Sequence, residues 1–349
     1  MDKLTNDRKL EHINIVNADE KVDRNKNYFD KIQLVHRALP ELDFNKVDPS
    51  VSFMGKRLSF PLLISAMTGG DQEIVQIINK NLAIAAEETG VALGVGSQRV
   101  MFTHPTAKTS FEIREHAPTT LLFANLGAVQ FNYGFGLDQC REAIQAVDAD
   151  ALYFHLNPLQ EAVQPEGDVN FEKLAEKIGD MAKQLDKKVI VKEVGAGIGV
   201  KDAALLIRHG IRYIDIAGSG GTSWSRIENF RRDEKSEDDL GLLFQDWGNP
   251  TPLVLRAMRP YISKVTLVAS GGLRTGVDMA KAIILGARLC GMAKPFLKPA
   301  MESPEAVIKT IKRLEREYKT VLFLLGISRT NELHLNDSLM WNPNFTLHS

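Results

Sequence analysis

A cluster of polar residues lies in the segment from Tyr153 to Glu161. Within seven positions this segment supplies an imidazole, two amides and a carboxylate, from His155, Asn157, Gln160 and Glu161. On a strand His155 and Asn157 share one face, so these groups can converge where the strand ends. A lone histidine is more often a satisfied structural group, but this convergence favours a functional site. Glu161 could hold a hard cation such as Mg2+, with water and phosphate oxygens completing its coordination.

A single lysine, Lys192, interrupts the mainly apolar run from Val189 to Val194. Strand alternation sends Lys192 and Glu193 to opposite faces. If Lys192 points inward, its ammonium needs an anion or an electron-rich ring, because an unpaired buried charge costs several kcal/mol or loses its proton. An inward Lys192 therefore predicts a bound ligand. A Schiff-base lysine is the competing functional interpretation, and the spacing leaves it open.

Two turns that follow apolar runs carry side chains suited to a phosphate and to a heterocycle. Ser97, Gln98 and Arg99 place a hydroxyl, an amide and a guanidinium together, and Arg99 could clamp a phosphate through paired hydrogen bonds. Asn125 carries an amide that can both donate and accept toward the edge of a heterocycle. The alternative for Asn125 is a cap of the turn that follows.

Several loops have the glycine-rich composition of phosphate cradles. Backbone N–H groups at such turns and at helix N-termini bind phosphate oxygens, and barrels frequently build this site after strands seven and eight. A tight turn is the alternative for each loop alone, and it is favoured for the loop that carries Thr68. Together the loops predict a phosphate-bearing ligand. They span residues 65–70, 217–224, 270–276 and 291–295.

A small basic cluster near the N-terminus consists of Arg8, Lys9 and His12. In a helix Arg8 and His12 would lie one turn apart. One interpretation is a frayed terminus. The functional interpretation is a basic arm that folds over a substrate diphosphate.

A repeating scaffold must position these loops, and from Pro61 onward a short apolar run alternates with a segment of helical period. Eight such units predict a closed (β/α)8 TIM barrel, whose active site lies at the C-terminal ends of the strands. A doubly wound open sheet is the structural competitor. The predicted strands are 61–67, 91–96, 119–125, 151–157, 188–194, 213–217, 265–270 and 288–293. Predicted helices include 171–185 and 72–89, the latter with one apolar stripe formed by Ile74, Ile77, Ile78, Leu82 and Ala85.

Two regions fall outside this pattern. Residues 1–60 are predicted to form an N-terminal cap or lid on a barrel domain that spans residues 61–349. The loop 222–250, after strand six, crowds charged residues between Arg226 and Asp239. Charge this dense usually marks a solvated surface, although a loop of this length is more often a lid or a partner surface than filler.

The overall composition excludes several classes of partner. Lys and Arg total 43 against 44 Asp and Glu, a net charge of -1, so we expect neither nucleic acid nor a membrane surface as a partner. No segment approaches the roughly 18 apolar residues of a membrane span, and residues 1–11 lack a signal-peptide core, which predicts a cytoplasmic protein. Cys140 and Cys290 lack the spacing of a zinc site or disulfide framework, so we expect both to be buried.

Taken together, the motifs closely resemble the type 2 isopentenyl diphosphate isomerases over essentially the whole chain. The most specific element is the run His155-Leu156-Asn157-x-x-Gln160-Glu161. The other elements are Arg8-Lys9-x-x-His12, the loop 65–70, Ser97-Gln98-Arg99, Phe123-Ala124-Asn125, the loop 218–222 and the loop 270–274.

The resemblance implies an FMN-dependent (β/α)8 barrel that interconverts isopentenyl diphosphate and dimethylallyl diphosphate in isoprenoid biosynthesis. It also implies reduced FMN as the active cofactor, Mg2+ on the diphosphate, NADPH as reductant, and a homotetramer or homo-octamer. By motif, the catalytic residues would be His155, Gln160 and Lys192, and Glu161 would bind the metal. FMN would contact Ala66, Met67, Thr68, Ser97, Asn125, Lys192, Ser219, Thr222, Gly271, Gly272, Arg274, Ala293 and Lys294. The substrate would contact Arg8, Lys9, His12, Ser97, Gln98, Arg99, His155, Asn157 and Gln160.

The side chains of the predicted site are consistent with flavin-dependent proton transfer. Moving a double bond along an unactivated alkene needs a proton delivered to carbon, yet the predicted site contains no obvious pair of side-chain acids. The resemblance implies that reduced flavin acts as acid and base, while the protein supplies position, electrostatics and exclusion of water. We expect Lys192 to stabilise the anionic reduced flavin, and Arg99 to help fix the alkene over its ring.

Three rival functions make different demands on the sequence. A hydroxy-acid oxidase would need a histidine base in the loop after strand six, and an inosinate dehydrogenase would need a nucleophilic cysteine there. The segment from Ser219 to Trp224 contains neither residue type. A non-catalytic phosphate-binding barrel would explain the glycine-rich loops, but not the polar cluster from His155 to Glu161.

Overall fold

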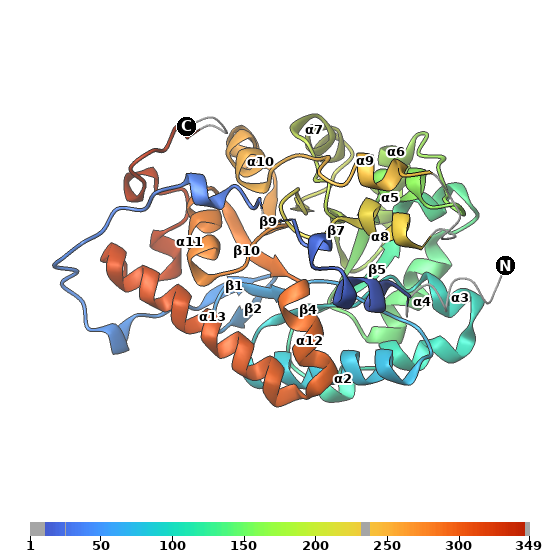
Figure 1. Ribbon diagram of the computed structural model, residues 1–349, viewed down its shortest axis with the longest axis horizontal. Helices are drawn as coiled ribbons and strands as arrows, with labels where there is room; N and C mark the ends of the chain where they lie inside the picture. The colour runs from blue at the N-terminus through green and yellow to red at the C-terminus, as the bar shows by residue number, and fades with distance from the viewer. Residues whose placement is uncertain (1–10, 25, 232–237, 346–349) are drawn as a thin grey trace.

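The computed structural model describes residues 11–24, 26–231 and 238–345. Eight parallel strands close into a barrel in the order β10-β3-β4-β5-β6-β7-β8-β9 (Figure 1). This confirms the predicted (β/α)8 fold, and the pairing of β10 with β3 excludes the open sheet. The strands are β3 (Leu62–Ile64), β4 (Ala92–Gly94), β5 (Leu122–Gly127), β6 (Ala151–Leu156), β7 (Lys188–Glu193), β8 (Tyr213–Asp215), β9 (Thr266–Ser270) and β10 (Ala287–Met292).

Helices connect the strands and surround the barrel (Figure 1). Short helices and 3-10 turns fill the longer loops at the C-terminal ends of the strands. The α-helices are α2 (Glu73–Thr89), α3 (Arg99–Thr103), α4 (Leu137–Val147), α5 (Pro158–Val163), α6 (Leu174–Gln184), α7 (Val200–Arg208), α8 (Trp224–Phe230), α9 (Leu240–Leu243), α10 (Thr251–Ala257), α11 (Gly276–Ile284), α12 (Lys294–Glu302) and α13 (Pro304–Leu325).

Helix α2 shows how the apolar period sets a buried face. Val75, Ile78 and Leu82 are buried against the barrel, as residues spaced three or four apart on one helix face should be. The predicted stripe was wrong at Ile77, which is 38% exposed because it lies outside that face. The helix ends at Gly90, whose φ of 67° is the left-handed conformation that favours glycine.

At its N-terminal end the barrel interior is a separate apolar core, and a short hairpin covers that end. Strands β1 (Val51–Phe53) and β2 (Lys56–Leu58) pair antiparallel. Their buried side chains pack with inward-facing residues of the barrel, among them Phe123, Tyr153 and Leu289. Because the N-terminal end of the barrel is filled in this way, a ligand can enter only from the opposite end.

The N-terminal extension crosses the C-terminal end of the barrel. Residues 11–18 are helical. Asp23 forms a β-bridge with Thr222, and the Arg24 backbone N–H donates to Gly221 O at 3.1 Å. The Arg24 guanidinium also donates to Gly195 O at 2.6 Å. The extension is thus tied to the loops after β7 and β8.

The charged loop after β8 is partly helical, and its first helix is not a solvated surface. Helix α8 carries Glu228, which is fully buried. Arg226 Nε donates to the Asp19 carboxylate at 2.6 Å, so this helix is also joined to the N-terminal extension. The charges of α8 are therefore paired within the protein, whereas residues 232–237, which carry much of the charge of the predicted surface loop, lie outside the described residues.

The predictions for the two cysteines and for membrane-spanning segments can be compared with the structure. Both cysteines are buried, as expected, and burial raises the pKa of the Cys140 thiol to about 12. In the described part of the chain, every helix is too short or too polar to cross a membrane.

Candidate active site

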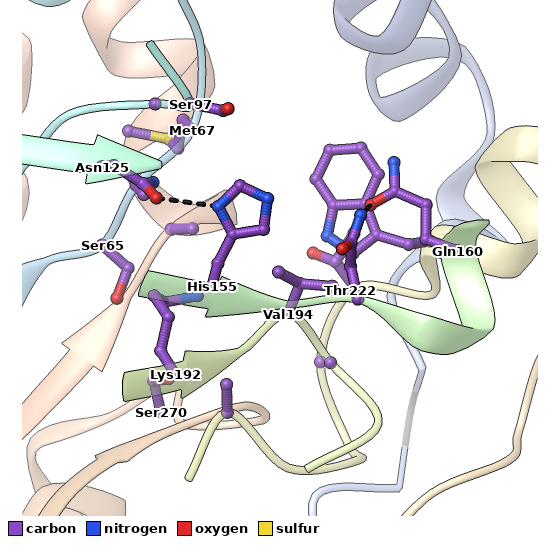
Figure 2. A pocket seen from close by; sticks show the side chains of 18 of the residues that line it. Ser65, Met67, Ser97, Asn125, His155, Gln160, Lys192, Val194, Thr222 and Ser270 are labelled. Atoms are coloured by element: carbon purple, nitrogen blue, oxygen red, sulfur yellow. Dashed lines mark hydrogen bonds between the residues drawn. The ribbon is translucent and has the colours of Figure 1, made fainter. Parts of the chain in front are cut away.

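A cavity opens at the C-terminal ends of the barrel strands, beneath α8 and the N-terminal extension. Side chains from β5, β6 and β7 point into it, as Figure 2 shows for Asn125, His155 and Lys192. Most of the predicted site residues therefore come together in one place. Those that line the cavity are His12, Ala66, Met67, Thr68, Ser97, Arg99, Asn125, His155, Asn157, Gln160, Glu161, Lys192, Thr222, Gly271, Gly272, Arg274, Ala293 and Lys294.

Two predicted contact residues lie elsewhere. The Gln98 side chain is fully buried, where its Nε2 donates to Ala143 O at 2.9 Å and its Oε1 accepts from the Asn125 backbone N–H. Ser219 is 2% exposed and does not line the cavity. Gln98 thus supports Asn125 from behind, and neither Gln98 nor Ser219 is among the lining residues, so their predicted contacts are not brought together with the others. Arg8 and Lys9 lie outside the described residues.

Lys192 lies on the floor of the cavity and is 7% exposed. Its Nζ donates to Glu193 O at 2.6 Å and lies 5.8 Å from the centre of the Tyr153 ring. Burial lowers the pKa of Lys192, and the charges of Asp215 and Glu193 oppose that shift. The inward orientation that predicts a ligand is thus present.

The neighbouring Glu193 points away from Lys192, as strand alternation predicts. Its carboxylate accepts backbone N–H groups of residues 194–197 at 2.5 to 2.8 Å and so shapes the loop after β7. Burial raises the pKa of Glu193, and these backbone hydrogen bonds oppose the shift. Glu193 therefore builds the loop, whereas Lys192 faces the cavity.

His155 is oriented by Asn125, from the adjacent strand. Asn125 Nδ2 donates to Val95 O at 3.0 Å, which leaves its Oδ1 as the acceptor for His155 Nδ1 at 2.9 Å (Figure 2). Gly127 lies beside the imidazole, and a Cβ at that position would come within 3.1 Å of His155 Nε2. The Asn125 hydrogen bond thus orients the ring, and Gly127 leaves room beside it.

Gln160 is oriented by a residue that the sequence did not identify. Its Nε2 donates to Glu228 Oε1 at 2.7 Å, and its Oε1 accepts from Asn157 at 3.3 Å. Glu228 Oε1 also accepts from His12 Nε2 at 3.1 Å, and Arg231 Nη1 donates to Glu228 Oε2 at 2.5 Å. Glu228 thus joins α8, the N-terminal extension and the loop after β6.

The electrostatics of Glu228 follow from these contacts. Burial alone would raise the pKa of its carboxyl, but the hydrogen bond and charge of His12 and the charge of Arg231 outweigh burial and lower it to about 2. Trp224 and Glu228 lie one helical turn apart on α8. The His12 ring packs edge-on against Trp224 at 5.1 Å, so both residues face the same neighbour.

Glu161 lies at the rim with its carboxylate held in place. Its Oε1 accepts from Asn157 Nδ2 at 2.7 Å, and its Oε2 accepts from Gln164 Nε2 at 2.5 Å. Among the described residues, no group of three histidine, cysteine or acidic side chains forms a metal cluster. Any cation at Glu161 would need ligand oxygens and water to complete its shell.

Asp168 connects Glu161 with Arg99, and the sequence did not identify it either. Its backbone N–H donates to Glu161 Oε2 at 2.7 Å. Its carboxylate accepts from Arg99 Nη1 at 2.7 Å and from Gln130 Nε2 at 2.8 Å. The residue predicted to clamp a phosphate and the residue predicted to hold a metal are therefore positioned together.

The glycine-rich loops after β8 and β9 pack directly on each other. Gly271 has a φ of 93°, and a Cβ there would lie 2.0 Å from Gly218 O, so only glycine fits. Arg274 forms an ion pair with Asp23, and Lys294 Nζ lies 3.8 Å from the same carboxylate. This corner of the cavity thus combines close backbone approach with two cations.

The fold is that of a (β/α)8 barrel with a cavity at the C-terminal ends of its strands, and comparison with known proteins identifies its class. The chain belongs to the FMN-dependent dehydrogenase family, which matches residues 6–114 and 145–341. Within that family it is a member of the type 2 isopentenyl-diphosphate delta-isomerases, as the resemblance implied.

Three of its relatives are named isopentenyl-diphosphate delta-isomerase. The protein from Paracoccus zeaxanthinifaciens is 54% identical over 95% of this chain and 96% of its own length. The protein from Hydrogenovibrio crunogenus is 51% identical over 95% of this chain and 97% of its own length. The protein from Pyrococcus furiosus is 42% identical over 93% of this chain and 84% of its own length.

Solved structures support the fold. The flavin-binding domain of baker's yeast flavocytochrome b2 superposes with a TM-score of 0.65 at 19% identity, covering 91% of this chain and 77% of that chain. A lactate oxidase from Pediococcus acidilactici also gives a TM-score of 0.65, at 16% identity, covering 89% and 83%. At these identities the likeness concerns architecture alone.

Proposed function

We propose that the protein interconverts isopentenyl diphosphate and dimethylallyl diphosphate, with reduced FMN as the acid and base and Mg2+ on the diphosphate. The observation that carries this proposal is the convergence of His155, Gln160, Glu161 and Lys192 in one cavity. The names of the relatives support the substrate pair.

The cavity fits FMN in three respects. Gly271 and Gly272 line the cavity in glycine-rich loops, whose backbone N–H groups could bind a phosphate. Ser65 Oγ and Thr68 Oγ1 line the cavity as buried oxygens without a hydrogen-bond partner among the described residues, which suits a ligand with polar edges. Lys192 provides a buried positive charge. When bound, reduced flavin would supply the proton-transfer groups that the protein side chains lack.

The residues of the chain would then supply position and charge. Lys192 would supply a positive charge to the cavity that holds the flavin. Asn125 would keep the His155 imidazole turned toward the substrate, and Glu228 would keep the Gln160 amide in one orientation. Arg99 would exchange Asp168 for a diphosphate oxygen. Helix α8 and the N-terminal extension would exclude water from the alkene.

Glu161 would hold Mg2+ with the substrate diphosphate and water as the other ligands. We expect Glu161→Gln to raise the Mg2+ concentration needed for half-maximal activity on the order of tenfold, because a neutral amide binds a hard cation more weakly than a carboxylate. A Mg2+ titration of initial rates measures this. Glu166→Gln, which alters an exposed carboxylate in the same loop, should leave the titration unchanged. An unaltered midpoint for Glu161→Gln would refute the assigned role.

Three further expectations remain predictions. NADPH would reduce the flavin, the protein would assemble as a homotetramer or homo-octamer, and it would act in the cytoplasm. Sedimentation velocity of the FMN-loaded protein tests the assembly, and a monomer at micromolar concentration would contradict it.

The experiment that tests the function is anaerobic incubation with FMN, NADPH, Mg2+ and isopentenyl diphosphate. We expect dimethylallyl diphosphate to form in many turnovers for each NADPH oxidised, because no net redox change occurs. Omitting FMN should abolish the product. Bound, reduced flavin without product would overturn the proposal, and oxidation of a 2-hydroxy acid by the same preparation would instead assign an oxidase.

A further inference from the structure

A charged residue outside the proposed site lies in the barrel interior below the cavity. Asp215, on β8, is fully buried. The strand register aligns Lys192 with Asp215, and His155 with Lys192 on the next strand. Three consecutive strands thus place an imidazole, an ammonium and a carboxylate at one level of the barrel.

The Asp215 carboxylate is surrounded by hydrogen-bond donors. Ser270 Oγ donates to Oδ1 at 2.6 Å, and the Tyr153 hydroxyl lies 3.5 Å from Oδ2. Tyr153 also places its ring 5.8 Å from Lys192 Nζ. Burial raises the pKa of Asp215, while the charge of Lys192 and the Ser270 hydrogen bond oppose that shift. The donors and the nearby ammonium favour the ionised carboxylate.

Stability does not account for a buried charge at this position. Barrel interiors are normally filled by branched apolar side chains, and a buried ion pair is often no more stable than apolar residues of similar volume. Val268 and Leu289, also buried inside this barrel, are apolar. We therefore attribute the presence of the Asp215 charge to its electrostatic effect on Lys192.

We infer that Asp215 is a positioning residue that acts through Lys192. Its negative charge favours the protonated form of the lysine, so that a site for an anionic ring exists before the ring arrives. The inference rests on the proposed function only in naming that ring as reduced flavin. Asp215 itself touches neither flavin nor substrate.

Other titratable groups around this pair have different roles. The Glu193 carboxylate accepts the backbone N–H groups of residues 194–197, so it acts on Lys192 through its charge, while the Glu193 backbone O accepts from Lys192 Nζ. On β10, burial raises the pKa of the Cys290 thiol, and Asp215 adds to that shift. Burial likewise raises the pKa of Tyr153, which leaves its hydroxyl as a neutral donor. Asp215 is thus the principal counter-charge to Lys192 in this layer.

The first test uses the protein without flavin. We expect Asp215→Asn to move the titration midpoint of Lys192 to lower pH, observed by NMR of lysines labelled at the carbon bonded to Nζ, with Lys192→Met identifying the signal. Ser270→Ala removes one hydrogen bond and keeps the carboxylate, so it should move the midpoint much less. A Lys192 midpoint that is unchanged in Asp215→Asn would overturn the inference, whether or not flavin binds.

The second test is a double-mutant cycle on FMN affinity. We expect Asp215→Asn to weaken binding of reduced FMN on the order of tenfold at pH 8, with the loss recovered as the pH is lowered and Lys192 regains its proton. In a Lys192→Met background the same change should have no further effect, because Asp215 acts through that lysine. Additive losses, or a loss that does not depend on pH, would contradict the inference.

A folding defect in Asp215→Asn would be addressed with the double variant Asp215→Leu/Lys192→Met. This variant removes both charges and fills the layer with apolar groups, so we expect it to fold. Its FMN affinity should equal that of Lys192→Met alone. A further loss of affinity in the folded double variant would show that Asp215 acts independently of Lys192.

Discussion

Replacing Lys192 with methionine is expected to weaken FMN binding and to lower kcat by about 10²- to 10³-fold, the usual loss when one preorganised electrostatic contact is removed. Methionine keeps most of the side-chain volume but removes the charge on the cavity floor. The loss should be larger for reduced than for oxidised FMN, because the reduced ring carries the negative charge. Fluorescence titration measures affinity for the oxidised form, and anaerobic titration measures affinity for the reduced form.

Lys188→Met is the matched control, since Lys188 lies on the same strand at the opposite end of the barrel and its Nζ is 5.9 Å from the Tyr213 ring. It should bind FMN normally and turn over at the rate of the unaltered protein. Equal effects of the two substitutions would remove Lys192 from the account. Full turnover by Lys192→Met would also contradict the role assigned to Lys192, and it would exclude a Schiff base formed by this lysine.

Replacing Glu228 with glutamine is expected to destabilise the fold by about 3 kcal/mol and to reduce turnover. The carboxylate is fully buried and serves His12, Gln160 and Arg231 together. A neutral amide leaves the Arg231 charge without its buried partner and presents a donor where an acceptor is needed. Gln160 then loses the contact that fixes its orientation. Chemical denaturation and steady-state kinetics measure the two losses.

The same carboxylate predicts a dependence of stability on pH. The folded protein holds its pKa at about 2, below the ordinary value of 4.5. Because the folded pKa is depressed, its contribution is complete above about pH 4.5 and declines as the pH falls toward 2, so Glu228→Gln should flatten the loss of stability in that range. Glu11→Gln is the control, since Glu11 is an exposed partner of the same Arg231. If both variants lose equal stability, burial of Glu228 is not the cause.

Most of the barrel could be predicted from the sequence because its signals are local. Each strand is a short apolar run that ends at a polar or glycine-rich loop, and eight repeats of that unit leave few architectures. The predictions were wrong about which side chains of α2 are buried and about the residue at which strand β5 begins. Strand β5, predicted to begin at Thr119, begins at Leu122, because the backbone N–H groups of Thr119 and Thr120 donate to the Glu87 carboxylate instead of pairing in the sheet.

The candidate site could be predicted where strand alternation applies, and less well in loops. His155 and Lys192 face the cavity because they lie on strands whose period is known. Gln98 lies past the end of its strand, where the backbone turns and directs the amide inward to Asn125. Glu228 and Asp215 depend on partners far along the chain, and no local pattern reveals whether a charged residue will be buried against them.

The central claim is that the reaction proceeds by addition and removal of a proton. Anaerobic incubation in D2O with FMN, NADPH, Mg2+ and isopentenyl diphosphate, followed by NMR, tests it most directly. We predict dimethylallyl product that carries deuterium from the solvent, and whose formation depends on reduced flavin. Product formed without deuterium, or product formed equally well without flavin, would contradict the claim.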